Sequence, residues 1–92
     1  RQVAAAQRQQ QAPHKREADK LEKELGQLHA QLAAVEQRLG DSAIYEAARK
    51  DELRDALAEQ ARLKSREADL EERWMLALET LEALQAELEA AS

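Results

Sequence analysis

Apolar residues recur along two stretches of the chain with the alternating three- and four-residue spacing of a coiled-coil seam. All seven seam positions of the first stretch are apolar: Ala18, Leu21, Leu25, Leu28, Leu32, Val35 and Leu39. The second stretch has eleven seam positions, of which nine are apolar: Leu53, Ala56, Gln60, Leu63, Glu67, Leu70, Trp74, Ala77, Leu81, Leu84 and Leu88. This spacing predicts two long amphipathic helices, each with a narrow apolar stripe.

Between the two stretches lie residues that end one helix and begin another. Gly40 directly follows the last seam residue, in the place of a helix-ending glycine. Asp41 and Ser42 are good N-cap residues for a second helix. Because so short a connection forces neighbouring helices to run antiparallel, we expect an all-α fold, a two-helix antiparallel coiled-coil hairpin over residues 14–92. Its expected parts are a helix over 14–39, a turn over 40–44 and a helix over 45–90.

The chain upstream of the hairpin has a different character. Residues 1–13 form an upstream linker segment that can itself be helical, and Pro13 disfavours a helix that continues through it. We expect the first helix to break there and Trp74, opposite His14, to cap the seam rather than to bind a ligand. The Leu-rich end of the second helix then needs cover from this segment, from upstream protein or from a second copy of the chain. That end comprises Leu76, Leu78, Leu81, Leu84 and Leu88.

The charged residues beside the seam predict how the two helices are aligned. If the numbers of facing seam residues sum to 88, so that Leu25 faces Leu63, all six doubly charged flanking pairs are opposite in sign. These pairs are Glu17–Arg73, Glu24–Arg66, Arg38–Glu52, Lys15–Glu71, Glu22–Lys64 and Glu36–Lys50. A slip of one heptad in either direction places like charges together, so the charges favour this register.

Composition narrows the possible classes of protein. Ala, Leu, Glu, Lys and Arg make up 62 of the 92 residues, which is typical of a long helix or coiled coil. Only three residues are Val or Ile, which disfavours a β fold, and the absence of Cys excludes disulfides and thiolate-bound metal. The chain starts at Arg1 and has no apolar run that would form a signal peptide or membrane span. We interpret it as a fragment of a larger cytoplasmic protein.

No catalytic, cofactor-binding or metal site is evident from residue spacing. The two histidines, His14 and His29, lie fifteen residues apart without further ligands at metal-binding spacing, so we expect no zinc site. No nucleophile, base and orienting group occur together, so we expect no enzymatic activity in this fragment. We expect Glu67 either to extend from the seam toward Lys64 or to tune the specificity of helix pairing, and Tyr45 to close the hairpin tip over Leu39.

The predicted register leaves some basic residues outside the seam pairs. Arg16, Lys20 and Lys23 occupy f, c and f positions and form one outward stripe on the first helix. Arg54 and Arg62 face outward on the second helix. These five residues are the candidate nucleic-acid-binding residues, acting through phosphate contacts without sequence preference; the alternative is a solvated face. The net charge of −5 disfavours uniform binding of nucleic acid along the whole rod.

The turn and its flanks carry a family resemblance. The chain reads Leu-Gly-Asp-Ser-Ala-Ile-Tyr-Glu over 39–46 and Arg-Lys-Asp-Glu-Leu over 49–53, with Leu-Glu-Lys-Glu-Leu upstream over 21–25 and Glu-Glu-Arg-Trp downstream over 71–74. This arrangement resembles the C-terminal coiled-coil domain of ABC-F ATPases over residues 13–92, most closely the YheS-like branch, with a related domain in the Uup-like branch. The turn, followed by Arg-Trp, is the more specific part of the resemblance.

The resemblance implies a parent protein with two ATP-binding cassettes, using ATP and Mg²⁺, and acting on translating ribosomes. This fragment has no P-loop, so it carries no ATP site of its own. We expect an accessory arm that contacts ribosome, RNA or DNA, and that can also pack on its own cassettes. The alternatives are a DNA-binding module of a Uup-like ATPase and a purely structural arm that dimerises through the Leu-rich end.

Overall fold

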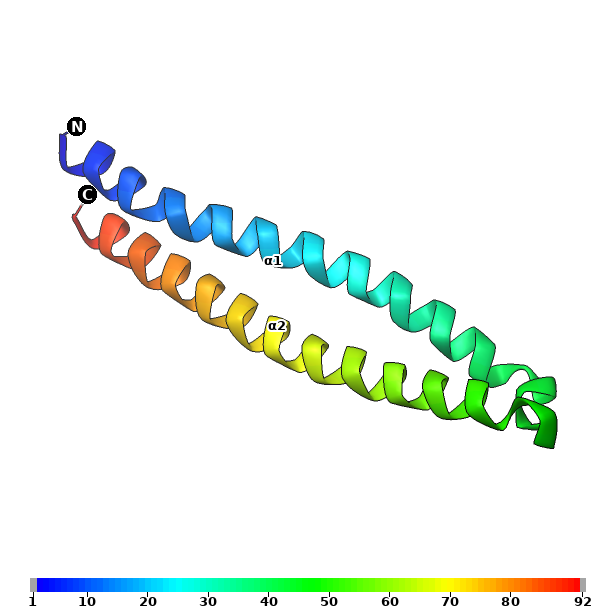
Figure 1. Cartoon of the computed structure of the whole chain (residues 1–92). Coiled ribbons are helices and arrows are strands. Elements are labelled where there is room, and N and C mark those ends of the chain that lie inside the picture. The colour runs from blue at the N-terminus through cyan, green and yellow to red at the C-terminus, as the bar shows by residue number, and fades with distance from the viewer. Residues whose placement is uncertain (1, 92) are drawn as a thin grey trace.

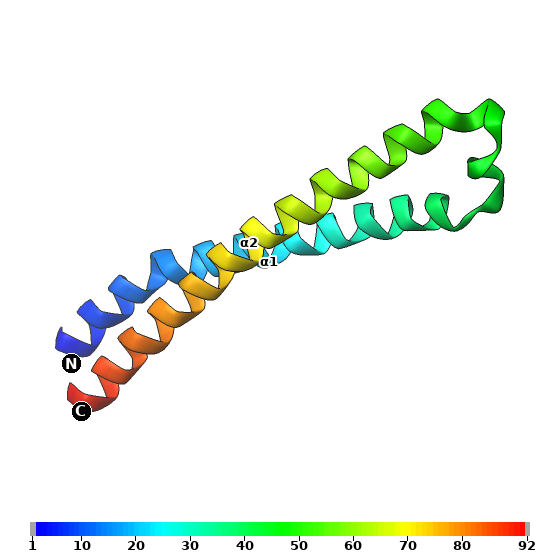
Figure 2. The ribbon, with the colours of Figure 1, turned by 90° about the horizontal axis from the view of Figure 1, so that it is seen from below.

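The computed structural model describes residues 2–91 and shows a helical hairpin with dimensions of 68 × 15 × 14 Å. Helix α1 (Gln2–Gly40) and helix α2 (Lys50–Ala91) lie side by side and run antiparallel, so the start of α1 and the end of α2 lie at one end of the rod (Figure 1). Seen from the second direction, α2 crosses α1 near the middle of the rod (Figure 2). The expected all-α antiparallel hairpin is confirmed, and neither described helix is long and apolar enough to cross a membrane.

The core is a narrow apolar seam between the helices, made mostly of leucines. On α1, six of the seven expected seam residues are buried and Leu39 is half-buried. On α2, the buried residues are the alternate seam positions Ala56, Leu63, Leu70 and Ala77, and the positions between them are half-buried. All eighteen expected seam positions therefore face the partner helix at least in part, which confirms the seam. A two-helix contact can bury only this narrow stripe, and the rest of each helix stays exposed.

Helix α1 runs without interruption through Pro13, so the expected break at this residue is wrong. Pro13 is exposed, and the carbonyl it leaves without a donor, that of Gln9, belongs to an exposed residue that water can solvate. The segment expected to be a linker is thus the first part of α1 where it is described. Trp74 does not cap the end of a helix but is half-buried against the core leucines, while His14 lines a groove with Leu76 and Ala77.

The upstream part of α1 continues the seam with polar and small residues. Ala4, Gln7, Gln11 and His14 are buried or half-buried at the seam spacing. The Gln11 amide donates a hydrogen bond of 3.4 Å from Nε2 to Oε1 of Gln85, and the buried Oε1 of Gln7 has no hydrogen-bond partner. The Leu-rich end of α2 is therefore covered only in part: Leu81, Leu84 and Leu88 are half-buried, whereas Leu76 and Leu78 are exposed.

The connection between the helices is longer than expected and contains two short 3-10 helices, η1 (Ser42–Tyr45) and η2 (Ala47–Arg49). Asp41 does act as an N-cap, since its carboxylate accepts a 3.0 Å hydrogen bond from the Ala43 N–H, but it caps η1 rather than α2. Glu46 then adopts an extended backbone, with φ −67° and ψ 146°, which interrupts the helical path. The second helix consequently begins at Lys50 instead of residue 45.

Two side chains close the tip. Ile44, between the end of α1 and the start of α2, is buried and only 1% exposed. Tyr45 is an exposed residue whose hydroxyl donates a 2.7 Å hydrogen bond to the carbonyl of Leu39, which confirms the expected closure over that residue. Helix α1 ends at Gly40, and this glycine has a negative φ, so the bond from Tyr45 satisfies a terminal carbonyl without a left-handed cap.

The start of α2 is reinforced by a bidentate ion pair. Arg49 donates to Glu52 through Nε at 2.8 Å and through Nη2 at 2.9 Å. These hydrogen bonds lower the pKa of the Glu52 carboxyl, with a further contribution from the charge of Arg49. A carboxylate in the first turn of a helix is also stabilised by the helix dipole.

The charged flanks agree with the expected register in part. Glu17–Arg73 at 3.0 Å and Glu24–Arg66 at 3.8 Å are formed as expected. Arg38 instead lies 4.0 Å from Glu59, one heptad away from the expected Glu52, which is bound by Arg49. Among the described residues, no ion pair within 4.0 Å forms in the other three expected pairs, which are Lys15–Glu71, Glu22–Lys64 and Glu36–Lys50. These long exposed side chains gain little from pairing in water, so opposite sign alone does not bring them together.

Candidate nucleic-acid interface

The stripe on α1 is exposed and carries unpaired positive charge. Arg16, Lys20 and Lys23 are all exposed on a continuous helix, one or two turns apart. Within the described part of the chain, none of the three has a carboxylate within 4.0 Å. Because a helix rises about 1.5 Å per residue, the stripe extends over roughly 10 Å along the rod. It presents three long, solvated cations on a stiff support, a suitable arrangement for contacts with phosphate groups.

The two candidates on α2 differ from each other. Arg54 has carboxylate partners on its own helix, Asp51 at 3.5 Å and Asp55 at 3.3 Å, so its charge is already locally balanced. Arg62 has no ion pair among residues 2–91 and lines a groove of about 360 Å³ together with Gln27 and Arg66.

The heptad positions decide which candidates share a side of the hairpin. Lys20 and Arg62 both occupy c positions, next to the g flank where Glu24 meets Arg66. Arg54 is at a b position, which belongs to the opposite flank. By heptad position, Arg62 therefore lies on the same flank of the hairpin as Lys20, and Arg54 lies on the opposite flank.

A second group of polar side chains was missed by reasoning from the sequence. His29 Nε2 lies 2.8 Å from Glu67 Oε2, and Glu71 is close enough that the ligand atoms of all three lie within 4.8 Å of one another. Glu67 thus contacts His29 across the seam, and no ion pair within 4.0 Å joins the described residues Glu67 and Lys64. Spacing along one chain could not reveal this cluster because its members come from two helices and meet only in the folded hairpin.

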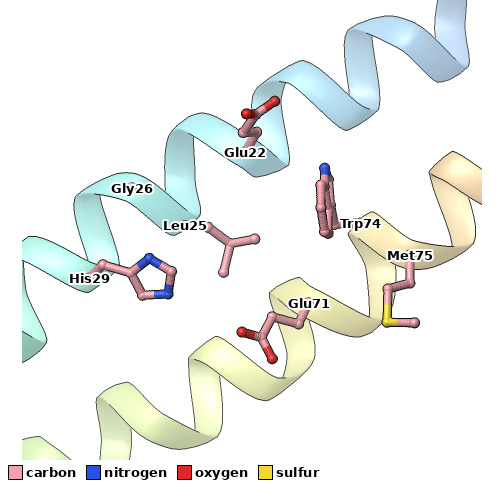
Figure 3. A pocket seen from close by; sticks show the side chains of 7 residues that line it. All are labelled: Glu22, Leu25, Gly26, His29, Glu71, Trp74 and Met75. Atoms are coloured by element: carbon pink, nitrogen blue, oxygen red, sulfur yellow. The ribbon is translucent and has the colours of Figure 1, made fainter.

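An apolar cavity of about 490 Å³ lies beside this cluster, between α1 and α2 (Figure 3). Leu25, Trp74 and Met75 supply its apolar surface, His29 and Glu71 also line it, and the His29 ring extends from α1 toward α2. Gly26 leaves this edge open, since no atom lies within 4 Å of where its Cβ would be.

Comparisons with protein-family models, with curated proteins and with solved structures found no match to this chain.

Proposed function

We propose that this chain is a non-catalytic accessory arm of a cytoplasmic ABC-F-type ATPase, and that the arm contacts ribosomal RNA. The observation that carries the proposal is the stripe of Arg16, Lys20 and Lys23, which is exposed and free of carboxylate partners on a rod 68 Å long. The ABC-F part of the proposal is supported by the resemblance of the turn over 39–46 and of Arg73-Trp74 to ABC-F proteins. ATP and Mg²⁺ would then belong to the cassettes of the parent protein.

Such an arm would act by extending from the parent protein and placing its basic stripe against the phosphates of the RNA. The apolar seam holds α1 and α2 together as one rod. The stripe is therefore held at a fixed distance from the base of the hairpin. Three phosphate contacts would give binding that weakens steeply with salt and has no preference for base sequence. Arg62, which occupies a c position as Lys20 does, is a further candidate contact on the same flank of the hairpin. With one Trp and one Tyr in the chain, base stacking contributes little to this contact.

The experiment is a salt series of RNA binding with the triple variant Arg16→Glu, Lys20→Glu and Lys23→Glu. For the unmodified chain, three phosphate contacts predict a slope of log K against log salt of roughly −2 to −3. The triple variant is expected to lose binding while its helicity, measured by circular dichroism, stays unchanged.

A charge-matched control places the same three reversals on the opposite flank and the tip: Lys50→Glu, Arg54→Glu and Lys64→Glu. All three residues are exposed, and the control is expected to retain most of the binding. Equal losses in the two variants would show that only net charge matters and would contradict a specific stripe. A duplex DNA of the same length tests the alternative DNA-binding role, which stronger binding to DNA would favour.

A second candidate function rests on a separate observation. Met75 and Leu76 are each 56% exposed and Leu78 is 39% exposed, which leaves apolar side chains exposed on α2 over residues 75–78. This surface supports the structural alternative, an arm that packs on its own cassettes or on a second copy of the chain. Light scattering of the chain and of the variant Met75→Gln with Leu78→Gln distinguishes a dimer from a monomer.

A further inference from the structure

We propose that His29, Glu67 and Glu71 together bind a divalent transition-metal ion of the Zn²⁺ class. The three residues supply one imidazole nitrogen and two carboxylates, and their ligand atoms lie within 4.8 Å of one another. Mixed nitrogen and oxygen ligands suit Zn²⁺ and its neighbours, whereas Mg²⁺ and Ca²⁺ prefer oxygen alone.

The distances are close to those that a metal requires. Ligands at about 2.1 Å from a tetrahedral ion stand roughly 3.4 Å apart. The 2.8 Å distance between His29 Nε2 and Glu67 Oε2 would increase slightly as the metal comes between these atoms, and Glu71 would move inward. These movements need only rotation of side chains, because His29 and Glu71 are exposed and Glu67 is half-buried.

The local charges also favour a cation. Glu67 and Glu71 are four residues apart on α2, where two like charges on one face destabilise a helix. Neither carboxylate has a Lys or Arg partner within 4.0 Å in the described hairpin. In addition, Glu67 occupies a seam position at which an apolar side chain would pack better. A bound divalent ion would balance both carboxylates at once.

The surroundings leave space for a further ligand. His29 and Glu71 lie at the edge of the cavity beside Leu25 and Trp74, so water can complete the coordination from the open side (Figure 3). Because the protein ligands come from both helices, the ion would join α1 to α2 near the middle of the rod. Metal binding is then expected to raise the thermal stability of the hairpin.

The experiment is a titration of the metal-free chain with Zn²⁺ by calorimetry, repeated with Co²⁺, whose visible absorption reports tetrahedral coordination. We expect one ion per chain and a higher melting temperature. Ni²⁺ is expected to quench the fluorescence of Trp74, which is the single tryptophan of the chain.

Two variants and their matched controls test the ligands. His29→Gln and Glu71→Gln are each expected to weaken Zn²⁺ binding by at least the roughly 10–100-fold that loss of an outer-shell partner costs in natural sites. His14→Gln and Glu72→Gln change the same residue types away from the cluster and should leave the affinity unchanged. Absence of Zn²⁺ binding, or equal affinity in the ligand variants and their controls, would overturn the proposal. The circular dichroism spectrum of each variant confirms that it is folded.

Discussion

The two halves of the hairpin have the same backbone architecture but different seams. Toward the tip, leucines meet leucines, and Leu21, Leu63 and Leu70 are almost fully buried. Toward the open end, the leucines of α2 face glutamine and alanine on α1, and Leu81 and Leu84 remain half-buried. The comparison shows that helix pairing can extend beyond the region that stabilises it. The leucine-filled half supplies most of the free energy of folding, and the open half is held by a weaker contact.

The largest expected effect comes from the leucine-filled half. Leu63→Ala should lower the free energy of unfolding by about 2–5 kcal/mol, because it leaves a cavity in a buried seam. Leu84→Ala, at the equivalent seam position of the open half, should lower it by less than half as much. Chemical denaturation followed by circular dichroism measures both values. Equal losses would show that the two halves contribute alike.

Pro13→Ala should strengthen the open half. Removal of an interior proline restores a helical hydrogen bond and should raise the free energy of local opening by up to about 3 kcal/mol. Amide hydrogen exchange over residues 2–14 measures the change. Gly26→Ala serves as the comparison in the other half, where no atom obstructs the new methyl group and the expected gain is about 0.5–1 kcal/mol. If hydrogen exchange is unchanged in the Pro13 variant, the proline is not the cause of the lower stability of the open half.

Gln7→Leu tests the polar seam directly. This change removes a buried amide oxygen that has no hydrogen-bond partner and places an apolar side chain against the Leu-rich end of α2. Relief of one unsatisfied polar group should stabilise the open half by about 1–3 kcal/mol. Gln10→Leu, an exposed position on the same helix, is the control and should have little effect. Hydrogen exchange that rises in the Gln7 variant would mean that the amide is satisfied in solution.

The smallest expected effect concerns the charged flanks. A double-mutant cycle on Glu24 and Arg66 should give a coupling energy of about 0.2–1 kcal/mol, as for other exposed ion pairs. The same cycle on Glu22 and Lys64 should give a value near zero, since these residues form no ion pair within 4.0 Å. Similar coupling in both cycles would indicate that the register rests on the general pattern of charge rather than on formed contacts.

The sequence by itself determined the fold class and the seam. The spacing of leucines fixes which face of each helix is buried, and a short connection between two such helices allows only an antiparallel pair. The closure of the tip by Tyr45 and the exposure of Arg16, Lys20 and Lys23 also follow from local position on a helix. These features are predictable because they depend on residues that are close together in the chain.

The tertiary structure decided the remaining features, most of which depend on contacts between residues that are distant in the chain. Helix α1 continues through Pro13 where it packs on α2. The tip contains two 3-10 helices before α2 begins, and Ile44 is buried in the first of them. The ion pairs of Arg54 with Asp51 and Asp55 are a local exception, since all three residues lie on the first turns of α2. The grouping of His29 with Glu67 and Glu71 arises only when two helices meet, because the alignment of the helices, and not spacing in the sequence, sets the distance between those side chains.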